Sequence, residues 1–178
     1  MHKNLIFTTP DKKYKDTFLK GIEEFQKEKE RLYPTVDALD ISDLKNNFEK
    51  YLEKWDKESK SIDLEPGRVP QTIYWLIVDG VYTGQVSVRH HLNDNLLKVG
   101  GNIGYGVVPS ERRKGYGTEL LRRALVECKE MGLDKVLVTC DENNVGSRKI
   151  IEKNGGVLEN IVPTETDKPA KCRFWINL

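Results

Sequence analysis

A glycine-rich turn between an apolar strand and an amphipathic helix constrains this chain more than any other feature. The stretch VVPSERRKGYGTELLRRAL, residues 107–125, places three basic residues before Gly115 and Gly117 and then becomes apolar at helical spacing. The first N–H groups of a helix have no intrahelical partner, and the helix dipole adds about half a positive charge there. Glycines also let an anion approach the backbone. The turn therefore predicts a site for a ligand with more than one phosphate group.

Two common nucleotide-binding motifs do not fit this turn. A dinucleotide fingerprint needs G-x-G-x-x-G, but Leu120 stands at the third glycine position. A P-loop needs G-x-x-x-x-G-K-[ST], and no lysine follows Gly117. What remains is R-x-x-G-x-G, from Arg112 to Gly117, after a strand that ends in GVVP and before an amphipathic helix. A basic loop that is merely solvated needs no such flanks, so the combination favours a binding site.

The other segments predict one mixed sheet with helices on its faces, in the order β-α-α-β-β-β-α-β-α-β-β. Amphipathic helices are expected over residues 11–31 and from an N-cap at Ser42 to Trp55. Asp79-Gly80 lies between apolar runs and predicts a β-hairpin. Helices should also follow Gly115 and Asn144. The further expected strands are residues 5–8, 104–108, 135–140, 156–162 and 171–178.

Composition excludes several classes of protein. The chain has 178 residues, 38% of them apolar and 32% charged, which is typical of one soluble domain. Its formal net charge of +1 provides no overall electrostatic field that would attract nucleic acid or anionic membranes. It has no apolar run of signal-peptide or membrane-spanning length. Cys128, Cys140 and Cys172 show no CxxC spacing, so neither disulfides nor a metal site are expected. We therefore expect a cytoplasmic protein.

The turn and its flanks resemble the hallmark of the GNAT superfamily of N-acetyltransferases, which is [Q/R]-x-x-G-x-[G/A] after a strand that ends in V-x-P. The chain matches this pattern at Val107, Pro109, Arg112, Gly115 and Gly117. A second family pattern, N-x-x-[AS] before an apolar helix that ends in K-x-G, is matched at Asn144, Ser147, Lys153 and Gly155.

The resemblance implies an α+β fold of the α/β/α type, with a central, mostly antiparallel mixed sheet and helices on both faces. It covers most of the chain, so we expect a single domain over residues 1–178. Residues 1–70 would form a variable, helical part on the substrate side. Residues 71–178 would form the acetyl-CoA-binding core.

The resemblance also implies acetyl-CoA as the co-substrate. Its diphosphate would contact the N–H groups of residues 113–118, and its pantetheine arm would extend the sheet at the edge of strand 104–108. Asn144 would bind the pantetheine, cap its own helix, or do both. The residues implied in binding are Val107, Val108, Arg112, Arg113, Lys114, Gly115, Tyr116, Gly117, Thr118, Asn144 and Ser147.

The catalytic base is less well defined. A lysine-like amine has a pKa of about 10.4, so a base must remove a proton before the amine attacks the acetyl carbonyl directly. Many family members carry a carboxylate near the 104–108 strand, where this chain offers Asn102 and Tyr105. The candidate catalytic residues are His90, His91 and Tyr105, and by alternation at most one of the two histidines faces the cleft.

The sequence also leaves alternatives for the groups that stabilise the oxyanion and the leaving thiolate. A backbone N–H near Val107 or Val108 would donate to the oxyanion. The family's tyrosine in the short helix is replaced by Ile151. Either Tyr105 or Tyr116 therefore protonates the leaving thiolate, or the thiolate leaves unassisted.

Two functions from different classes remain after these arguments. The first is transfer of an acetyl group from acetyl-CoA to a primary amine of a small molecule or peptide. The second is a CoA-binding sensor or structural module without turnover. A nucleic-acid binder is disfavoured by the near-zero net charge and by the lack of aromatic residues interleaved with the basic run. The acceptor amine is not identified by the sequence, and a homodimer stays open because such dimers are common.

Overall fold

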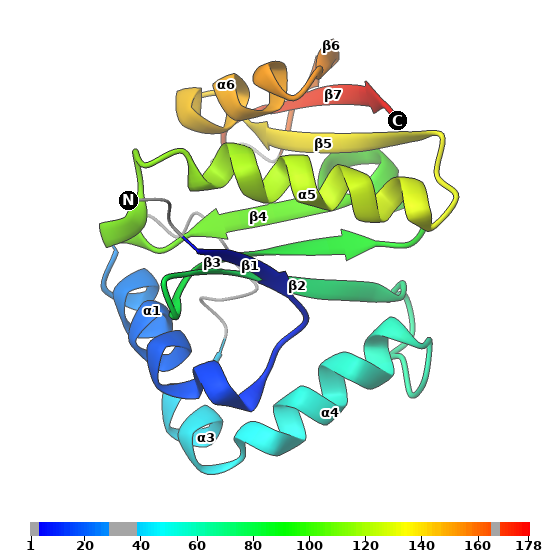
Figure 1. Cartoon of the computed structure of the whole chain (residues 1–178). Coiled ribbons are helices and arrows are strands. Elements are labelled where there is room, and N and C mark those ends of the chain that lie inside the picture. The colour runs from blue at the N-terminus through cyan, green and yellow to red at the C-terminus, as the bar shows by residue number, and fades with distance from the viewer. Residues whose placement is uncertain (1–3, 29–38, 165–167) are drawn as a thin grey trace.

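Seven strands form one sheet within the described residues, which are 4–28, 39–164 and 168–178 of this computed structural model (Figure 1). The strand order is β1-β2-β3-β4-β5-β7-β6. Neighbouring strands in this part of the chain are antiparallel except for β4 and β5, which are parallel. The strands are β1 (Leu5–Thr8), β2 (Gln71–Val78), β3 (Val81–Arg89), β4 (Ile103–Val107), β5 (Lys135–Asp141), β6 (Val157–Val162) and β7 (Lys171–Asn177).

Helices cover both faces of the sheet, as Figure 1 shows. On one face lie α1 (Lys15–Lys27), α3 (Ile41–Asn46) and α4 (Phe48–Ser59), and on the other lie α5 (Tyr116–Glu130) and α6 (Val145–Lys153). Short turns of other helix types are η1 (Lys12–Tyr14), η2 (Leu96–Gly100) and η3 (Pro109–Glu111). The predicted α+β architecture with a mixed, mostly antiparallel sheet is confirmed.

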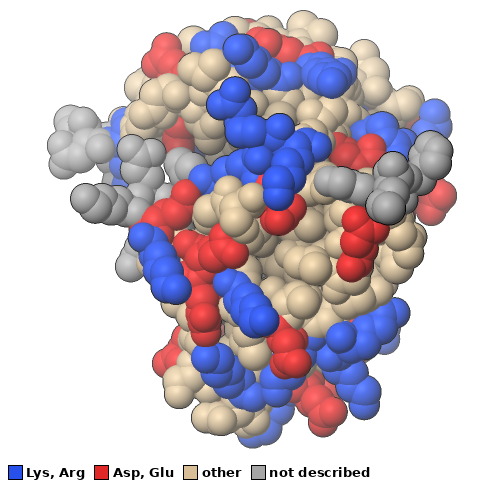
Figure 2. Space-filling view, turned by 60° about the vertical axis from the view of Figure 1, so that its left-hand side comes forward, with Lys and Arg blue, Asp and Glu red and all other residues tan. Residues whose placement is uncertain are grey.

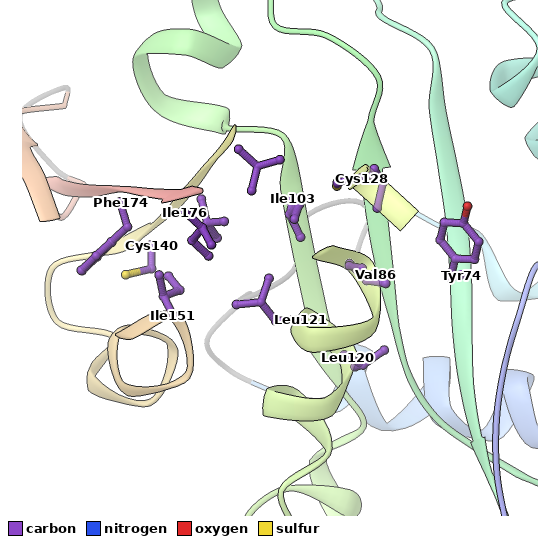
Figure 3. Close-up of a cluster of buried hydrophobic side chains, with 14 of the residues drawn as sticks. Tyr74, Val86, Ile103, Leu120, Leu121, Cys128, Cys140, Ile151, Phe174 and Ile176 are labelled. Atoms are coloured by element: carbon purple, nitrogen blue, oxygen red, sulfur yellow. The ribbon is translucent and has the colours of Figure 1, made fainter. Parts of the chain in front are cut away.

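Two hydrophobic cores hold the helices to the sheet. Phe18 of α1 and Phe48 of α4 pack around Trp75 of β2, which is completely buried. On the opposite face, Leu120 and Leu121 of α5 pack with apolar side chains of β3 and β4, as Figure 3 shows. The sheet is therefore fixed from both sides, and the start of α5 follows directly from the end of β4.

The N-terminal helices differ from the sequence prediction in two details. Asp40, not Ser42, caps α3, because its carboxylate accepts a hydrogen bond from the N–H of Asp43 at 3.0 Å. The second predicted helix is interrupted at Asn47, which separates α3 from α4. The first predicted helix begins with η1 and continues as α1 to Lys27, and residues 29–31 of that prediction lie outside the described residues.

The parallel pair β4 and β5 is where the sheet opens. Within the described residues the two strands pair at Ile103 and Val138, whereas β3 and β4 pair from Val88 and Ile103 to Gly84 and Val107. The side chain of Asn102 reinforces the start of the pair, since its Oδ1 accepts from the N–H of Leu137 at 2.9 Å. Beyond this point the C-terminal part of β4 stays paired with β3 on one side, and on its β5 side it faces an opening.

Candidate functional site

The turn before α5 presents backbone N–H groups toward the opening. Gly115 is the N-cap of α5 and has φ +86°, and Arg113 has φ +64°. The first N–H that bonds back into the helix is that of Glu119, which donates to the carbonyl of Gly115 at 3.2 Å. The N–H groups of Gly117 and Thr118 therefore have no acceptor within the helix. Together with the positive end of the helix dipole, they form a candidate site for an anion.

The two glycines of the turn are needed for different reasons. A Cβ at Gly115 would have no heavy atom within 4 Å, so glycine serves there to adopt a left-handed conformation. Gly117 has no such conformation, but a Cβ there would lie 2.7 Å from Cδ1 of Ile150 in α6. Gly115 thus permits the shape of the turn, and Gly117 keeps space open between α5 and α6.

The C-terminal part of β4 turns its backbone toward the same opening. Val108 donates to the carbonyl of Thr83 at 2.9 Å, and in an antiparallel pair alternate residues point to the same neighbour. The backbone N–H and C=O groups of Gly106 therefore point to β3, as the N–H of Val108 does. Those of Tyr105 and Val107 point to the other side, where β5 has separated from β4. An extended ligand can add to this edge as a strand would.

The opposite wall of the opening is formed by α6. Asn144 caps this helix, because its Oδ1 accepts from the N–H of Ser147 at 3.0 Å. The hydroxyl of Ser147 also lies 2.8 Å from the hydroxyl of Tyr105. Burial raises the pKa of Tyr105 despite this hydrogen bond, so its phenol stays protonated at neutral pH.

The opening is a cavity of about 640 Å³ that runs from β4 to the start of α5. Such a volume is in the range of small-molecule and cofactor sites. Figure 2 shows Lys and Arg side chains gathered on the face that includes the start of α5, with Asp and Glu side chains beside them. The residues that line the cavity are Phe25, Tyr105, Gly106, Val107, Glu111, Arg112, Arg113, Gly115, Tyr116, Gly117, Thr118, Asn144, Val145, Gly146, Ser147, Lys149 and Ile150.

A family model described as "Acetyltransferase (GNAT) domain" matches residues 12–157, which is most of the chain. The chain belongs to the GNAT acetyltransferase family. No curated protein sequence matches it. The predicted family, fold and enzyme class are thus confirmed.

Solved structures of other acetyltransferases share the GNAT fold at low sequence identity. One is yncA from Salmonella typhimurium with acetyl-CoA, with a TM-score of 0.65, 15% identity and coverage of 98% of this chain and 94% of yncA. A second is RimL, a ribosomal L7/L12 alpha-N-protein acetyltransferase in complex with CoA. Its TM-score is 0.70 and its identity 11%, and the match covers 98% of this chain and 94% of RimL. A third is the Microcin C7 self immunity acetyltransferase MccE in complex with acetyl-CoA and AMP. Its TM-score is 0.68 and its identity 17%, and the match covers 98% of this chain and 92% of MccE. The predicted co-substrate, acetyl-CoA, is therefore a ligand of GNAT proteins of this fold.

The three basic residues of the GNAT turn are arranged differently from one another. The guanidinium of Arg112 donates to both carboxylate oxygens of Glu28, at 2.6 and 2.8 Å. Lys114 forms an ion pair with Glu111 at 3.0 Å, and it is not among the cavity-lining residues. Arg113 is exposed and lines the cavity. Of the three predicted phosphate ligands, Arg113 is thus the side chain best placed to reach an anion.

Three other predicted residues lie away from the cavity. Val108 is buried in the core beside α1, and its N–H donates to Thr83, so we leave it out of the proposed GNAT site. His90 lies beyond the far end of β3, and its Nε2 is 2.9 Å from the hydroxyl of Thr72. Burial and the neighbouring His91 lower the pKa of His90. Neither histidine lines the cavity.

Sequence reasoning missed the contribution of α1 to the GNAT site. Phe25 lines the cavity, and Glu24 and Glu28 bind the segment between β4 and α5. Partners 84 to 86 positions apart leave no local pattern in the sequence. Lys149 on α6 was also missed, although its place near the N-x-x-S motif was a signal.

Cys140 and the remaining cysteines are buried. Burial raises the pKa of the Cys140 thiol to about 12, which suits a core residue and not a nucleophile. Among the described residues, no group of three or more His, Cys, Asp or Glu residues could hold a metal ion. In the same part of the chain, no helix has the length and apolar character needed to cross a membrane.

Proposed function

We propose that this protein transfers the acetyl group of acetyl-CoA to a primary amine of a small molecule or peptide by direct attack. The observation that carries the proposal is the cavity that joins two features: the open edge of β4, and the N–H groups at the start of α5. An anion site placed at the end of an open strand suits a ligand with a diphosphate at one end and an amide-containing arm. Acetyl-CoA has this form.

The diphosphate would bind at the start of α5. Gly117 and Thr118 would donate their N–H groups, and Arg113 would add a full positive charge from the exposed side of the turn. The bare Gly115 and Gly117 leave the backbone accessible to the anion. Lys149 lines the same cavity from α6 and would add a second cation.

The thioester end would lie along β4. Tyr105 would pair through its backbone groups with an amide of the pantetheine arm. Of the two N–H groups expected to stabilise the oxyanion, that of Val108 already donates to Thr83. The N–H of Val107 is therefore the donor that we assign to the developing negative charge.

Tyr105 and Ser147 would stabilise the leaving sulfur. A thiol has a pKa of about 8.5, which is below that of a phenol, so the proton of Tyr105 would not be transferred completely to a thiolate. The raised pKa of Tyr105 keeps its hydroxyl available as a hydrogen-bond donor instead. The Ser147 hydroxyl, 2.8 Å away, holds this donor in place.

Release of the CoA thiol tests the proposal directly. The protein is incubated with acetyl-CoA and a panel of amines that includes free amino acids, polyamines and peptide N-termini, and free thiol is followed with a thiol-reactive dye. Thiol release that depends on one class of amine is the expected result. Tight binding of acetyl-CoA without release in the presence of any amine would favour the alternative, a CoA-binding module without turnover.

We expect Arg113→Ala to weaken acetyl-CoA binding by about 10- to 100-fold, or about 1.4–2.8 kcal/mol, which is in the range for a charged hydrogen bond. The backbone cost of the left-handed conformation is similar for alanine and arginine, so the change isolates the side chain. Calorimetry at two salt concentrations measures the loss, which should shrink at high salt. Arg122→Ala, further along α5 and paired with Glu119, is the matched control. Equal losses in both variants would contradict the assignment.

We expect Tyr105→Phe to lower kcat by at least about tenfold while the Kd of acetyl-CoA changes little, because only the hydroxyl beside Ser147 is removed. Since the phenol of Tyr105 stays protonated at neutral pH, the ratio of the two kcat values should be constant between pH 7 and 9. Steady-state kinetics across this range measure it. An unchanged kcat would show that the thiolate leaves without help from Tyr105.

A further inference from the structure

Two carboxylates at the C-terminal end of α1 hold the segment that connects β4 to α5. Glu24 accepts hydrogen bonds from the N–H and the hydroxyl of Ser110, at 3.0 and 3.1 Å. Glu28, the extended residue that directly follows α1, accepts two hydrogen bonds from the guanidinium of Arg112, at 2.6 and 2.8 Å. Helix α1 is thereby attached at two points to the residues that precede the anion site.

The stability of α1 does not explain these two acidic residues. The C-terminal end of a helix carries a partial negative charge, which disfavours nearby carboxylates. Glu24 and Glu28 therefore stand where the helix alone would favour neutral or basic side chains. Their compensation comes from Ser110 and Arg112 in the connecting segment.

Arg112 extends this attachment to the end of β4. Its Nε donates to the carbonyl of Val107 at 3.1 Å, while its two terminal nitrogens bind Glu28. The side chains of Arg112 and Glu28 are 33% and 26% exposed. A bidentate pair that is shielded to this degree is stronger and better oriented than an exposed surface pair. Three segments, α1, β4 and the turn before α5, meet at this one guanidinium.

We propose that Glu28 is a positioning residue for acetyl-CoA, an inference that rests on the proposed function. Its carboxylate fixes Arg112, and through Arg112 it fixes the carbonyl of Val107 and the backbone that leads to Gly115. Arg112 then acts as a structural bridge, and Arg113 beside it is the cation that meets the diphosphate. Helix α1, which lies on the sheet face opposite α5, thereby helps to shape the co-substrate site.

The direction in which the Kd of acetyl-CoA changes when the charge of Glu28 is removed separates this proposal from a purely electrostatic effect. A negative charge close to an anionic ligand weakens its binding, so removing that charge should tighten binding. If Glu28 positions the site, the same removal should weaken binding. Glu28→Gln keeps the size and shape of the side chain, so the two explanations predict opposite changes in Kd.

We expect Glu28→Gln to raise the Kd and the KM of acetyl-CoA by about tenfold, with kcat changed by less than about twofold, as for loss of a charged hydrogen bond. Isothermal calorimetry and steady-state kinetics on the full chain measure these values. Glu23→Gln is the matched control, because Glu23 lies on the same helix but pairs with Lys45 of α3 at 2.9 Å. Thermal unfolding of both variants checks that the fold is kept.

Two further variants complete the test. Glu28→Asp keeps the charge but shortens the side chain, so it should also weaken binding if position matters. In Arg112→Ala, the additional change Glu28→Gln should have no further effect, because both residues act through one contact. A Glu28→Gln protein that binds acetyl-CoA as well as the parent, or more tightly, would overturn the inference. A parent protein that does not bind acetyl-CoA would instead overturn the proposed function.

Discussion

Replacing Gly117 with valine should abolish measurable binding of acetyl-CoA, with a loss of at least about 100-fold, or about 2.8 kcal/mol. The Cβ would lie 2.7 Å from Cδ1 of Ile150 and 3.6 Å from Cγ2 of Val107. The end of the Ile150 side chain can move to accept one methyl group. It cannot also accept the two further methyl groups of valine, whose rotamer is fixed within a helix. They would occupy the space beside the N–H groups that we assign to the diphosphate.

A graded series makes this test specific. Gly117→Ala should lose less affinity than Gly117→Val, because Ile150 can rotate away from a single methyl group. Calorimetric titration with acetyl-CoA measures both, and urea unfolding reports whether the packing of α5 on α6 is weakened as well. Normal affinity in the valine variant would mean that the diphosphate binds somewhere other than the start of α5.

The largest effect on stability is expected at Gly84, where β3 and β4 approach each other closely. A Cβ at Gly84 would lie 2.4 Å from the carbonyl oxygen of Gly106 and 3.0 Å from Cα of Val107. Both are backbone atoms, so no rotamer change relieves the clash and the two strands must separate. Gly84→Ala should therefore lower the free energy of unfolding by about 3 kcal/mol or more. It should also weaken acetyl-CoA binding, because Val107 ends the strand that we assign to the thioester.

Gly146→Ala is the matched control for Gly84→Ala. The nearest atom to a Cβ at Gly146 is Oδ1 of Asn144 at 3.6 Å, an ordinary contact, and alanine is favoured over glycine in a helix. Urea unfolding should give a stability equal to that of the parent or higher by up to about 1 kcal/mol. If Gly84→Ala unfolds at the same urea concentration as this control, the close approach of β3 and β4 is not a constraint on the fold.

The parts of the structure that the sequence predicted are those set by local patterns. The turn at Gly115 and Gly117, the hairpin at Asp79-Gly80 and the cap at Asn144 each depend on residues within a few positions of one another. Alternation and helical spacing extend such patterns into whole strands and helices. The turn that carries the candidate anion site could be predicted for the same reason, since it is formed by consecutive residues at one helix end, and binding of an anion there stays a prediction.

Three of the predicted site residues have contacts that depend on distant segments of the chain. Arg112 carries the charge expected of a phosphate ligand, but its partner Glu28 is 84 positions away and on the other side of the sheet. Val108 lies within the family motif, but the alternation of β4 turns its N–H toward β3. His90 has the chemistry of a base, but it lies at the opposite end of β3 from the start of α5. Residue type alone could not distinguish these roles.

The opening between β4 and β5 also divides the hydrogen-bonded ladders of the sheet into two halves. Strands β1 to β4 form one half and β5, β7 and β6 form the other, and the described ladder between the halves consists of the pair Ile103–Val138 and the adjoining contacts of Asn102. The boundary between β4 and β5 is therefore paired at one end and unpaired at the other within the described residues. A ligand that adds to the open end would therefore join the two halves of the sheet at the end where the described strands do not pair.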